Sequence, residues 1–333
     1  MTFTTTLIHE IESDKSGKQA IQTLLKCSEA DFSELLATAW NIRQKNFDPV
    51  LHCFYPGDLF PAISITGSQC ALHCKHCNKH YLSLMIPAER PEKLWEVCKN
   101  LEATGKIGCL ISGGYNEQAM LPFEQFIPVI KQIKDKTKLV LNVHTGLVSR
   151  EIALKLGEAG VDIVSFDVVG DEKTIQEMYG LKKSPENYLQ SLKFLRGSKI
   201  RYIVPHICIG LNQGRLEGEI RALTLIKGTN PDIIVFLGLI PTENTPIQNL
   251  LPPSPKEIAK IIATARLLFP TIPLSLGCMR PGKIIRNEID KLAIQAGVNR
   301  IEIPTQQAIQ YAIQKGLQIQ KHSSCCATPL KLL

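Results

Sequence analysis

Three cysteines stand close together in the stretch Cys70-Ala-Leu-His-Cys74-Lys-His-Cys77. Their C-x3-C-x2-C spacing follows a short apolar run over residues 61–66. Three thiolates this close can hold three irons of a cubane [4Fe–4S] cluster and leave the fourth iron without a protein ligand. An open iron is a place where a small molecule can bind and react. The pattern therefore indicates catalysis rather than electron transfer alone, with Cys70, Cys74 and Cys77 as catalytic and metal-binding residues.

A zinc site is the alternative interpretation of the same cysteines, with His73, His76 or His80 as fourth ligand. Structural zinc sites usually combine two ligand pairs of the C-x2-C or H-x3-H kind. The second pair is missing from the neighbouring sequence. The spacing therefore favours the iron–sulfur cluster.

The elements that must position these cysteines form a repeat of a short apolar run, a loop and an amphipathic helix. The expected strands cover residues 61–66, 107–112, 138–143, 161–166, 200–204, 232–238, 272–276 and 299–303. The expected helices cover residues 90–104, 122–134, 149–159, 185–196, 217–227, 255–268 and 282–296. Continuous apolar strands that alternate with helices predict a parallel sheet buried on both faces.

Six to eight such units predict an α/β fold of the (β/α) TIM-type barrel kind, full or partial. An open doubly wound sheet is the alternative, but no Gly-x-Gly-x-x-Gly follows the first expected strand. We expect a helical N-terminal extension over residues 1–55 with no strand, the barrel over 56–305, and a C-terminal helix and cysteine-bearing tail over 306–333. The stretch 52–57, which contains Cys53, looks like a loop because Pro and Gly interrupt it.

Polar residues gather where the expected strands end, as they do at the catalytic face of such barrels. Random placement would scatter them over both rims. The candidates for ligand binding are Ser112, Gly113, Gly114, Asn142, His144, Asp167, His206, Gly210 and Leu211. Each of the single polar residues has a bland alternative role as a structural hydrogen-bonding group.

Composition limits the classes of function. An apolar content of 44% over 333 residues is ample for a large core, and the net charge of +7 is spread without a Lys/Arg block. Nucleic-acid binding is therefore not expected. No stretch reaches membrane-spanning length, so we expect a soluble cytoplasmic protein without a membrane partner. Eleven cysteines in such a chain indicate metal or redox use rather than disulfides.

The cysteine triplet and the Ser112-Gly113-Gly114 turn resemble the radical S-adenosylmethionine (SAM) superfamily. The resemblance implies that SAM chelates the open iron and is cleaved to a 5′-deoxyadenosyl radical, which abstracts hydrogen from an unactivated C–H bond. It also implies that the Gly-Gly turn receives the SAM amino group. Ribose hydroxyls or the SAM carboxylate are the expected partners of Asn142, His144 and Asp167. The segment Val204–Leu211 resembles a motif that packs on adenine.

Residues 60–300 further resemble biotin synthase and, most closely, the archaeal-type two-component lipoyl synthases. The residues concerned are 277–282, 296–301 and the terminal Cys325-Cys326-Ala327. Two adjacent cysteines have no packing purpose in a short polar tail. If the tail closes the barrel mouth, Cys325 and Cys326 join Cys278 as ligands of a second, auxiliary [4Fe–4S] cluster, with Cys53 or Cys109 as the fourth ligand.

The resemblance implies a sulfurtransferase that uses the auxiliary cluster as sulfur donor. Its substrate would be an octanoyl chain on a lipoyl-domain or glycine-cleavage H protein. A companion radical SAM subunit and a reductant such as ferredoxin or flavodoxin would be further partners. Two other interpretations remain open: a radical SAM maturase or mutase that acts on a small molecule without sulfur transfer, and a non-enzymatic iron–sulfur or zinc protein.

Overall fold

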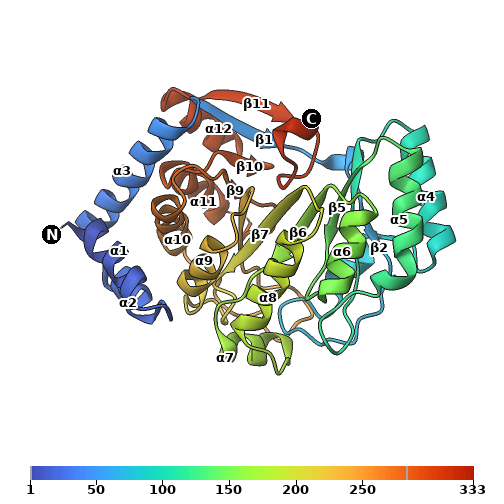
Figure 1. Cartoon of the computed structure of the whole chain (residues 1–333). Helices are drawn as coiled ribbons and strands as arrows, with labels where there is room; N and C mark the ends of the chain where they lie inside the picture. The colour runs from blue at the N-terminus through green and yellow to red at the C-terminus, as the bar shows by residue number, and fades with distance from the viewer. Residues whose placement is uncertain (1, 283) are drawn as a thin grey trace.

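The chain folds into one continuous sheet that is curled into a half-barrel, with helices packed on its outer face (Figure 1). This computed structural model describes residues 2–282 and 284–333. The sheet has eleven strands in the order β11-β1-β10-β9-β8-β7-β6-β5-β4-β2-β3. Each pair of neighbouring strands in this order is parallel. The expected α/β fold of the partial TIM-type barrel kind is confirmed.

The strands are short, and most are buried on both faces, as the apolar runs predict. They are β1 (Val50–Phe54), β2 (Ala62–Ser64), β3 (Ile86–Pro87), β4 (Gly108–Ser112), β5 (Val140–His144), β6 (Ile163–Asp167), β7 (Tyr202–Ile209), β8 (Ile234–Gly238), β9 (Leu274–Leu276), β10 (Arg300–Glu302) and β11 (Gln318–His322).

The helices begin at clear N-terminal signals, such as the capping box of Ser254 with Glu257 ahead of α10. They are α1 (Phe3–Ser13), α2 (Lys18–Lys26), α3 (Glu29–Asn46), α4 (Pro91–Ala103), α5 (Ile127–Lys136), α6 (Arg150–Glu158), α7 (Glu172–Thr174), α8 (Pro185–Arg196), α9 (Glu219–Lys227), α10 (Pro255–Leu268), α11 (Ile284–Gln295) and α12 (Gln306–Gln314). In the N-terminal extension, α3 packs against α10 and α11.

Two expectations for the chain ends are wrong. Residues 50–54 form β1 rather than a loop. Pro56 and Gly57 lie beyond the end of this strand and so do not interrupt it, and β10 and β11, which are distant in the sequence, both pair with it. Strand β11 lies in the expected tail, where the sequence Gln-Ile-Gln-Lys-His carries too few apolar residues to indicate a strand. Both strands depend on long-range pairing that no local pattern records.

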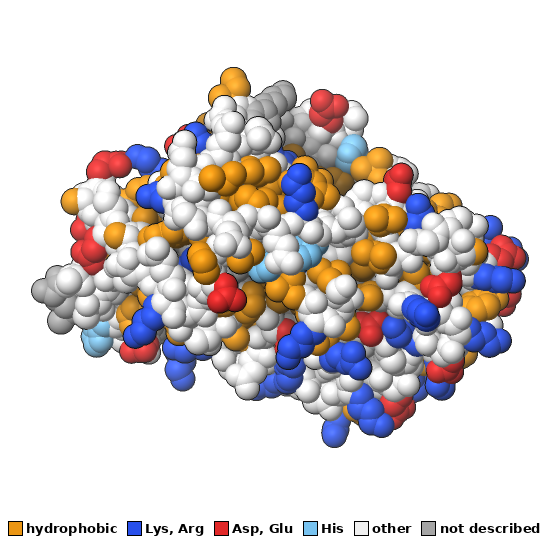
Figure 2. Space-filling model, turned by 90° about the horizontal axis from the view of Figure 1, so that it is seen from above, with side chains coloured by type: hydrophobic (Ala, Val, Ile, Leu, Met, Phe, Trp, Pro, Cys, Tyr) orange, Lys and Arg blue, Asp and Glu red, His pale blue; other side chains and the backbone are white. Residues whose placement is uncertain are grey.

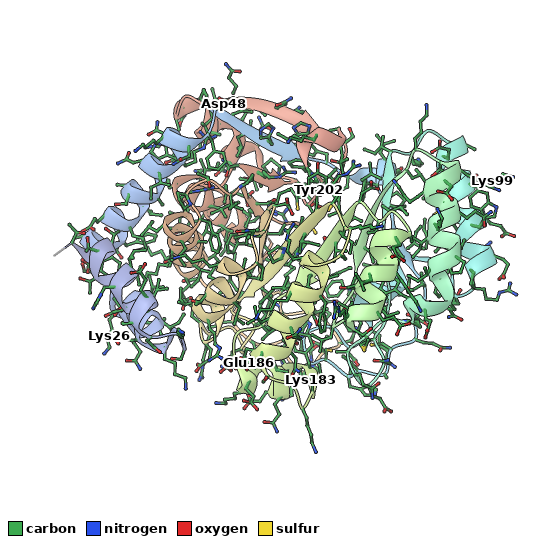
Figure 3. All side chains as sticks on the ribbon, in the orientation of Figure 1. Lys26, Asp48, Lys99, Lys183, Glu186 and Tyr202 are labelled. Atoms are coloured by element: carbon green, nitrogen blue, oxygen red, sulfur yellow. The ribbon has the colours of Figure 1, made fainter. Side chains whose placement is uncertain are left out.

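The two ends of the half-barrel are occupied by different parts of the chain. Tyr202, the first residue of β7, lies at the upper end in the view of Figure 3, on the side where Figure 1 places the C terminus. Lys183 and Glu186 mark the lower end, together with α7, which follows β6. The C-terminal ends of the central strands therefore point away from the chain terminus.

The tail after β11 enters the half-barrel instead of lying on its surface. Cys326 and Ala327 are buried and pack against Phe54, Ile163 and Val204. Because Ile163 and Val204 lie near the beginnings of their strands, the tail closes the end at which the strands begin. The expectation that the tail folds over the barrel mouth, beside the cysteine triplet, is wrong about the end, because the tail packs where β6 and β7 begin.

The surface carries no block of one charge in the view of Figure 2, where Lys and Arg side chains are interspersed with Asp and Glu. This agrees with the even spread of charge along the sequence. Within residues 2–282 and 284–333, no helix is both long enough and apolar enough to cross a membrane.

Candidate active site and second thiol cluster

The cysteine triplet lies in a loop that follows β2 and is folded into tight turns. The amide groups of Cys77 and Asn78 both donate to the carbonyl of Cys74, and Asn78 and Lys79 have positive φ angles. Cys74 is buried, whereas Cys70 and Cys77 are half-buried. Burial and then the neighbouring thiols of Cys77 and Cys70 raise the pKa of Cys74 to about 12. Neighbouring thiols that are buried or half-buried in this way fit a metal cluster, because iron binds the thiolate and offsets its charge.

The Gly113-Gly114 turn after β4 is packed directly on this loop. The Gly114 amide donates to Thr66 Oγ1 at 2.6 Å, and the Tyr115 amide donates to Cys70 Sγ at 3.3 Å. A Cβ atom on Gly114 would overlap with the Gln69 carbonyl and lie 2.5 Å from Cys70 Cβ. The structure thus gives Gly114 a role in seating the cysteine loop, beside the role toward SAM that we expected.

A cavity opens beside the cysteine loop at the C-terminal ends of β6, β7 and β8. His76 lines it and meets the ring of Tyr179 edge-on, with ring centres 4.9 Å apart. Burial lowers the pKa of His76 to about 4, so the ring is neutral at pH 7, and its buried Nδ1 has no hydrogen-bond partner among the described residues. Most of the remaining lining is apolar: Tyr81, Val168, Val169, Cys208, Leu211, Leu237, Gly238, Leu239, Ile240 and Met279, with Asp167 as the charged group.

Asp167 forms an ion pair with His144 across neighbouring strands, with 3.2 Å between Oδ2 and Nε2. Burial alone would raise the pKa of Asp167, but His144 and then His206 and His76 hold it at about 2. Burial lowers the pKa of His144 less than Asp167 raises it, so the net shift is upward. Asp167 is therefore ionised, and this pair places a negative charge at the rim of the cavity.

His206 lies beside this ion pair, with its ring centre 5.8 Å from that of His144. Its Nδ1 is 3.0 Å from the Val204 carbonyl, and burial lowers its pKa to about 4. A neutral imidazole held by the main chain fits the alternative role of a structural hydrogen-bonding group.

Three further candidates, Asn142, Gly210 and Ser112, make contacts that serve mainly to hold the fold. Asn142 is buried, accepts a hydrogen bond from Ser165 Oγ at 3.0 Å and leaves its Nδ2 without a partner among the described residues. Gly210 has a φ of +75° and packs on Pro253, which explains the glycine. Ser112 is buried at the end of β4 and precedes the glycine turn, while Leu211 lines the cavity.

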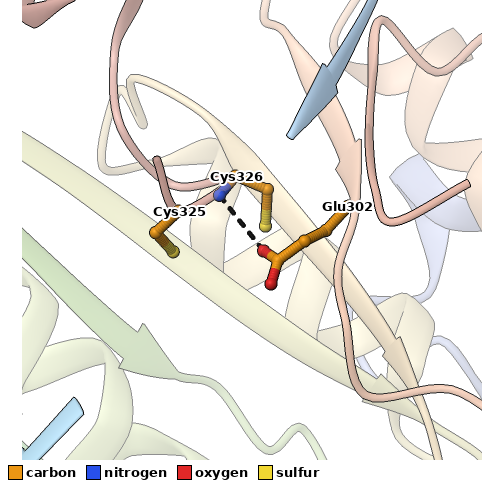
Figure 4. A group of neighbouring side chains, drawn as sticks. All are labelled: Glu302, Cys325 and Cys326. Carbon is orange, nitrogen blue, oxygen red and sulfur yellow. Dashed lines mark hydrogen bonds between the residues drawn. The ribbon is translucent and has the colours of Figure 1, made fainter. Parts of the chain in front are cut away.

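A second group of thiols lies inside the half-barrel, away from the triplet. Cys325 Sγ, Cys326 Sγ and a carboxylate oxygen of Glu302 all lie within 4.8 Å of one another (Figure 4). The Cys326 amide donates to Glu302 Oε2 at 3.1 Å. Burial, followed by the nearby Glu302 and Cys325, raises the pKa of the Cys278 thiol. The structure thus brings two of the three expected cysteines, Cys325 and Cys326, together with Glu302, while Cys278, which is exposed as a whole residue at the turn after β9, lies outside this 4.8 Å group.

Two buried arginines hold this second group in place. Arg300 donates to the carbonyls of Cys326 and Thr328 and stacks on Phe54, with 4.3 Å from its Cζ to the ring centre. Arg280 forms a fully buried ion pair with Asp290 at 2.7 Å and also donates to the Gly277 carbonyl. These contacts fix the tail on one side and the Cys278 turn on the other.

Cys53 and Cys109, the two expected candidates for a fourth ligand, face away from this group. On β1, Cys53 lies between His52 and Phe54, and Phe54 packs on the tail inside the half-barrel. Because side chains alternate along a strand, Cys53 points to the outer core. Cys109 faces outward in the same way, where the neighbouring thiol of Cys98 on α4 and then burial raise the pKa of its own free thiol. Neither side chain is placed to contribute to the second thiol group.

Sequence reasoning missed Glu302, Tyr179 and the two arginines. Glu302 and Arg300 had a readable signal, since both are charged residues at alternating positions of an otherwise apolar strand, residues 299–303. Tyr179 carried no such signal, because it lies in a π-helical turn after α7 that only the packing defines.

Comparison with known proteins identifies the class. Residues 64–223 match the family profile described as the radical SAM superfamily, and this segment contains the cysteine triplet, the Gly-Gly turn and the His144–Asp167 pair. The chain is therefore a radical SAM enzyme. Within that class it is biotin synthase-like: it is 25% identical over 284 residues to a biotin synthase from Ruthia magnifica, with 81% of this chain and 82% of the relative covered. A biotin synthase from Coxiella burnetii is 26% identical, with 84% and 85% covered.

Solved structures agree on the fold. A methylornithine synthase superposes with a TM-score of 0.63 at 17% identity, with 96% of this chain and 97% of that chain covered. A maturase of the [FeFe]-hydrogenase superposes with a TM-score of 0.67 at 18% identity, with 97% and 76% covered. At these identities the likeness concerns the half-barrel alone.

Proposed function

We propose that this radical SAM enzyme inserts sulfur into an unactivated C–H bond. The observation that supports the proposal most directly is the pair Cys325 and Cys326 beside Glu302, with Cys278 nearby, in a half-barrel that already carries a radical SAM cysteine triplet. The similarity to biotin synthases points to the same chemistry.

In this proposal Cys70, Cys74 and Cys77 hold the [4Fe–4S] cluster that binds SAM, and Cys278, Cys325 and Cys326 hold an auxiliary cluster. The first group, with SAM, supplies a 5′-deoxyadenosyl radical that removes a hydrogen atom, and the second supplies the sulfur. The Gly114 turn seats the first cysteine loop, and the apolar cavity lining excludes water from the reacting bond. The ionised Asp167 offers an acceptor to the ribose hydroxyls of SAM.

We infer a protein-bound octanoyl chain as the substrate, on a lipoyl-domain or glycine-cleavage H protein in the cytoplasm. The residues that resemble archaeal-type lipoyl synthases, 277–282, 296–301 and 325–327, include Cys278, Cys325 and Cys326 themselves and Arg300, which donates to the Cys326 carbonyl. The apolar side chains of Leu211, Leu237 and Leu239 in the cavity suit an aliphatic chain. A companion radical SAM subunit and a ferredoxin or flavodoxin reductant complete this proposal.

The test separates the two thiol groups. After anaerobic reconstitution, Cys70→Ala, Cys74→Ala and Cys77→Ala should each abolish the formation of 5′-deoxyadenosine from SAM. Cys278→Ala and the double variant Cys325→Ala/Cys326→Ala should still form 5′-deoxyadenosine with an octanoylated carrier but should yield no thiolated carrier by mass spectrometry. Unchanged thiolation in the double variant would refute the sulfur-donor role.

A radical SAM reaction without sulfur transfer, of the maturase or mutase kind, is the second candidate. It is favoured by the fold likeness to a methylornithine synthase and a hydrogenase maturase, and by the absence of inward-facing cysteines on β1 and β4 among the described residues. This candidate predicts that Cys325 and Cys326 are dispensable for substrate conversion.

A further inference from the structure

Glu302 carries a carboxylate that is buried beside two thiols and forms no ion pair among residues 2–282 and 284–333. The residue is 4% exposed, and its hydrogen bond from the Cys326 amide brings no positive charge. Arg300, two positions earlier, donates to the tail carbonyls instead. Arg286 is near enough to interact with Glu302 electrostatically but donates its hydrogen bond to the Ile303 carbonyl. Burial of an ionised carboxylate without a paired cation costs free energy, so a bound cation would stabilise this site.

The thiols around Glu302 indicate what that partner is. Cys325 Sγ, Cys326 Sγ and the Glu302 carboxylate all lie within 4.8 Å of one another, and Cys278, at the turn after β9, is near enough for Glu302 and Cys325 to raise the pKa of its thiol beyond the effect of burial. Two sulfur donors and one oxygen donor that converge, with Cys326 and Glu302 buried and a further thiol nearby, suit iron or another soft to borderline cation. Such a cation would offset the carboxylate charge and the thiolate charges at once.

We infer that Glu302 is the fourth protein ligand of the auxiliary iron–sulfur cluster, beside Cys278, Cys325 and Cys326. This inference rests on the proposed function, because it takes the auxiliary cluster from there, and it replaces Cys53 and Cys109 as fourth ligand. It also predicts a difference among the irons. Thiolates are the preferred ligands of such clusters, so the iron on the Glu302 oxygen is the most weakly held.

The backbone around Glu302 is built to aim the side chain inward. Ile303, directly after it, has a φ of +47°, which a β-branched residue rarely adopts. Its carbonyl accepts hydrogen bonds from Arg280 and Arg286. The end of β10 is therefore held in a strained conformation by the same arginine that fixes the Cys278 turn.

The experiment reads the auxiliary site alone. The background is Cys70→Ala/Cys74→Ala/Cys77→Ala, which removes the SAM-binding cluster, and the protein is reconstituted anaerobically with iron and sulfide. Two substitutions are tested separately in this background, Glu302→Gln and Glu302→Cys. Glu302→Gln keeps an oxygen acceptor for the Cys326 amide and so leaves the tail docked. Cys98→Ala, a buried thiol on α4 far from the site, is the matched control. The readouts are iron and sulfide per chain, the electron paramagnetic resonance spectrum and the rate of iron removal by a chelator.

We expect about four irons in the background and in the Cys98→Ala control. Glu302→Gln should hold about three and show the resonance of an oxidised three-iron cluster, or lose iron about tenfold faster or more. Glu302→Cys should keep about four and lose iron more slowly than the background. If Glu302→Gln does not fold, Glu302→Cys carries the test, and an unchanged chelation rate overturns the assignment.

The outcomes distinguish this inference from the proposed function. A background protein that binds no iron overturns the auxiliary cluster, and the sulfur-donor proposal fails with it. A background protein that binds iron, with identical spectra and chelation rates in Glu302→Gln, leaves the auxiliary cluster standing and overturns Glu302 as its ligand.

Discussion

Arg300 Nε donates a 3.1 Å hydrogen bond to the main-chain carbonyl of Cys326 inside the half-barrel. This contact joins the last strand of the repeating units to a tail that lies 26 residues further along the chain. Because Arg300 is 3% exposed and also binds the Thr328 carbonyl, a single buried guanidinium fixes the path of the tail. The position of the terminal cysteines is thus set from the barrel wall.

Replacing Arg300 with methionine should therefore release the tail. Two hydrogen bonds from a charged donor and the stacking on Phe54 are lost, and we expect the free energy of unfolding to fall by about 3 kcal/mol. Denaturant unfolding of the iron-free protein measures this loss. Thiol labelling should also reach Cys325 and Cys326 faster than in the wild type. Arg90→Met, at an exposed position ahead of α4, is the matched control, and equal labelling rates in both variants would contradict the role of Arg300.

Gly114→Ala should damage the cysteine loop. The added methyl group would overlap with the Gln69 carbonyl and lie 2.5 Å from Cys70 Cβ, so the loop must move. We expect loss of most iron from the SAM-binding cluster and of 5′-deoxyadenosine formation, with a destabilisation of about 1–3 kcal/mol. Iron analysis and product chromatography check this. Gly228→Ala, where the nearest atom to the new methyl group is the Leu225 carbonyl oxygen at 3.9 Å, should behave like the wild type. Full iron content in Gly114→Ala would show that the loop does not depend on this contact.

Asp290→Asn should destabilise the protein strongly. Asp290 and Arg280 are both fully buried, and the carboxylate also accepts from the Thr305 amide at 2.9 Å. Removal of the negative charge leaves a buried guanidinium without compensation, so we expect a loss of about 3–5 kcal/mol in unfolding free energy. Thermal and denaturant unfolding measure it. The double variant Arg280→Met/Asp290→Leu should recover part of the stability, since it removes both charges; a double variant less stable than Asp290→Asn would argue against this account.

The His144–Asp167 pair should give a stability contribution with two limits in pH. Asp167 has a pKa lowered from 3.8 to about 2, so its contribution is complete above pH 3.8 and is lost as the pH falls toward 2. His144 has a pKa raised from 6.5, so its contribution is complete below pH 6.5 and is lost as the pH rises through the raised value. The stability difference between wild type and Asp167→Asn should thus be largest between pH 3.8 and 6.5. Denaturant unfolding across this range measures it, and a difference that grows above neutral pH would contradict the ion pair.

The sequence alone was sufficient to predict the barrel, and it indicated the first cysteine group. The C-x3-C-x2-C spacing lies in one loop, and the apolar runs record strands that are buried on both faces, so both features are local. The glycine turn was also readable, although its packing on Cys70 was not. A local pattern states which residue types follow one another and cannot state what they touch.

The second site was decided by the tertiary structure. Cys278, Glu302 and the Cys325-Cys326 pair come from three separate segments, and strands β1 and β11, which the sequence pattern did not indicate, bring the tail to the barrel. Cys53 and Cys109 looked equally suitable in the sequence, because the direction of a side chain depends on the register of its strand. Pairing between distant strands fixed that register, turned both cysteines outward and turned Glu302 inward. The residue types were thus written in the sequence, and their convergence came from long-range strand pairing.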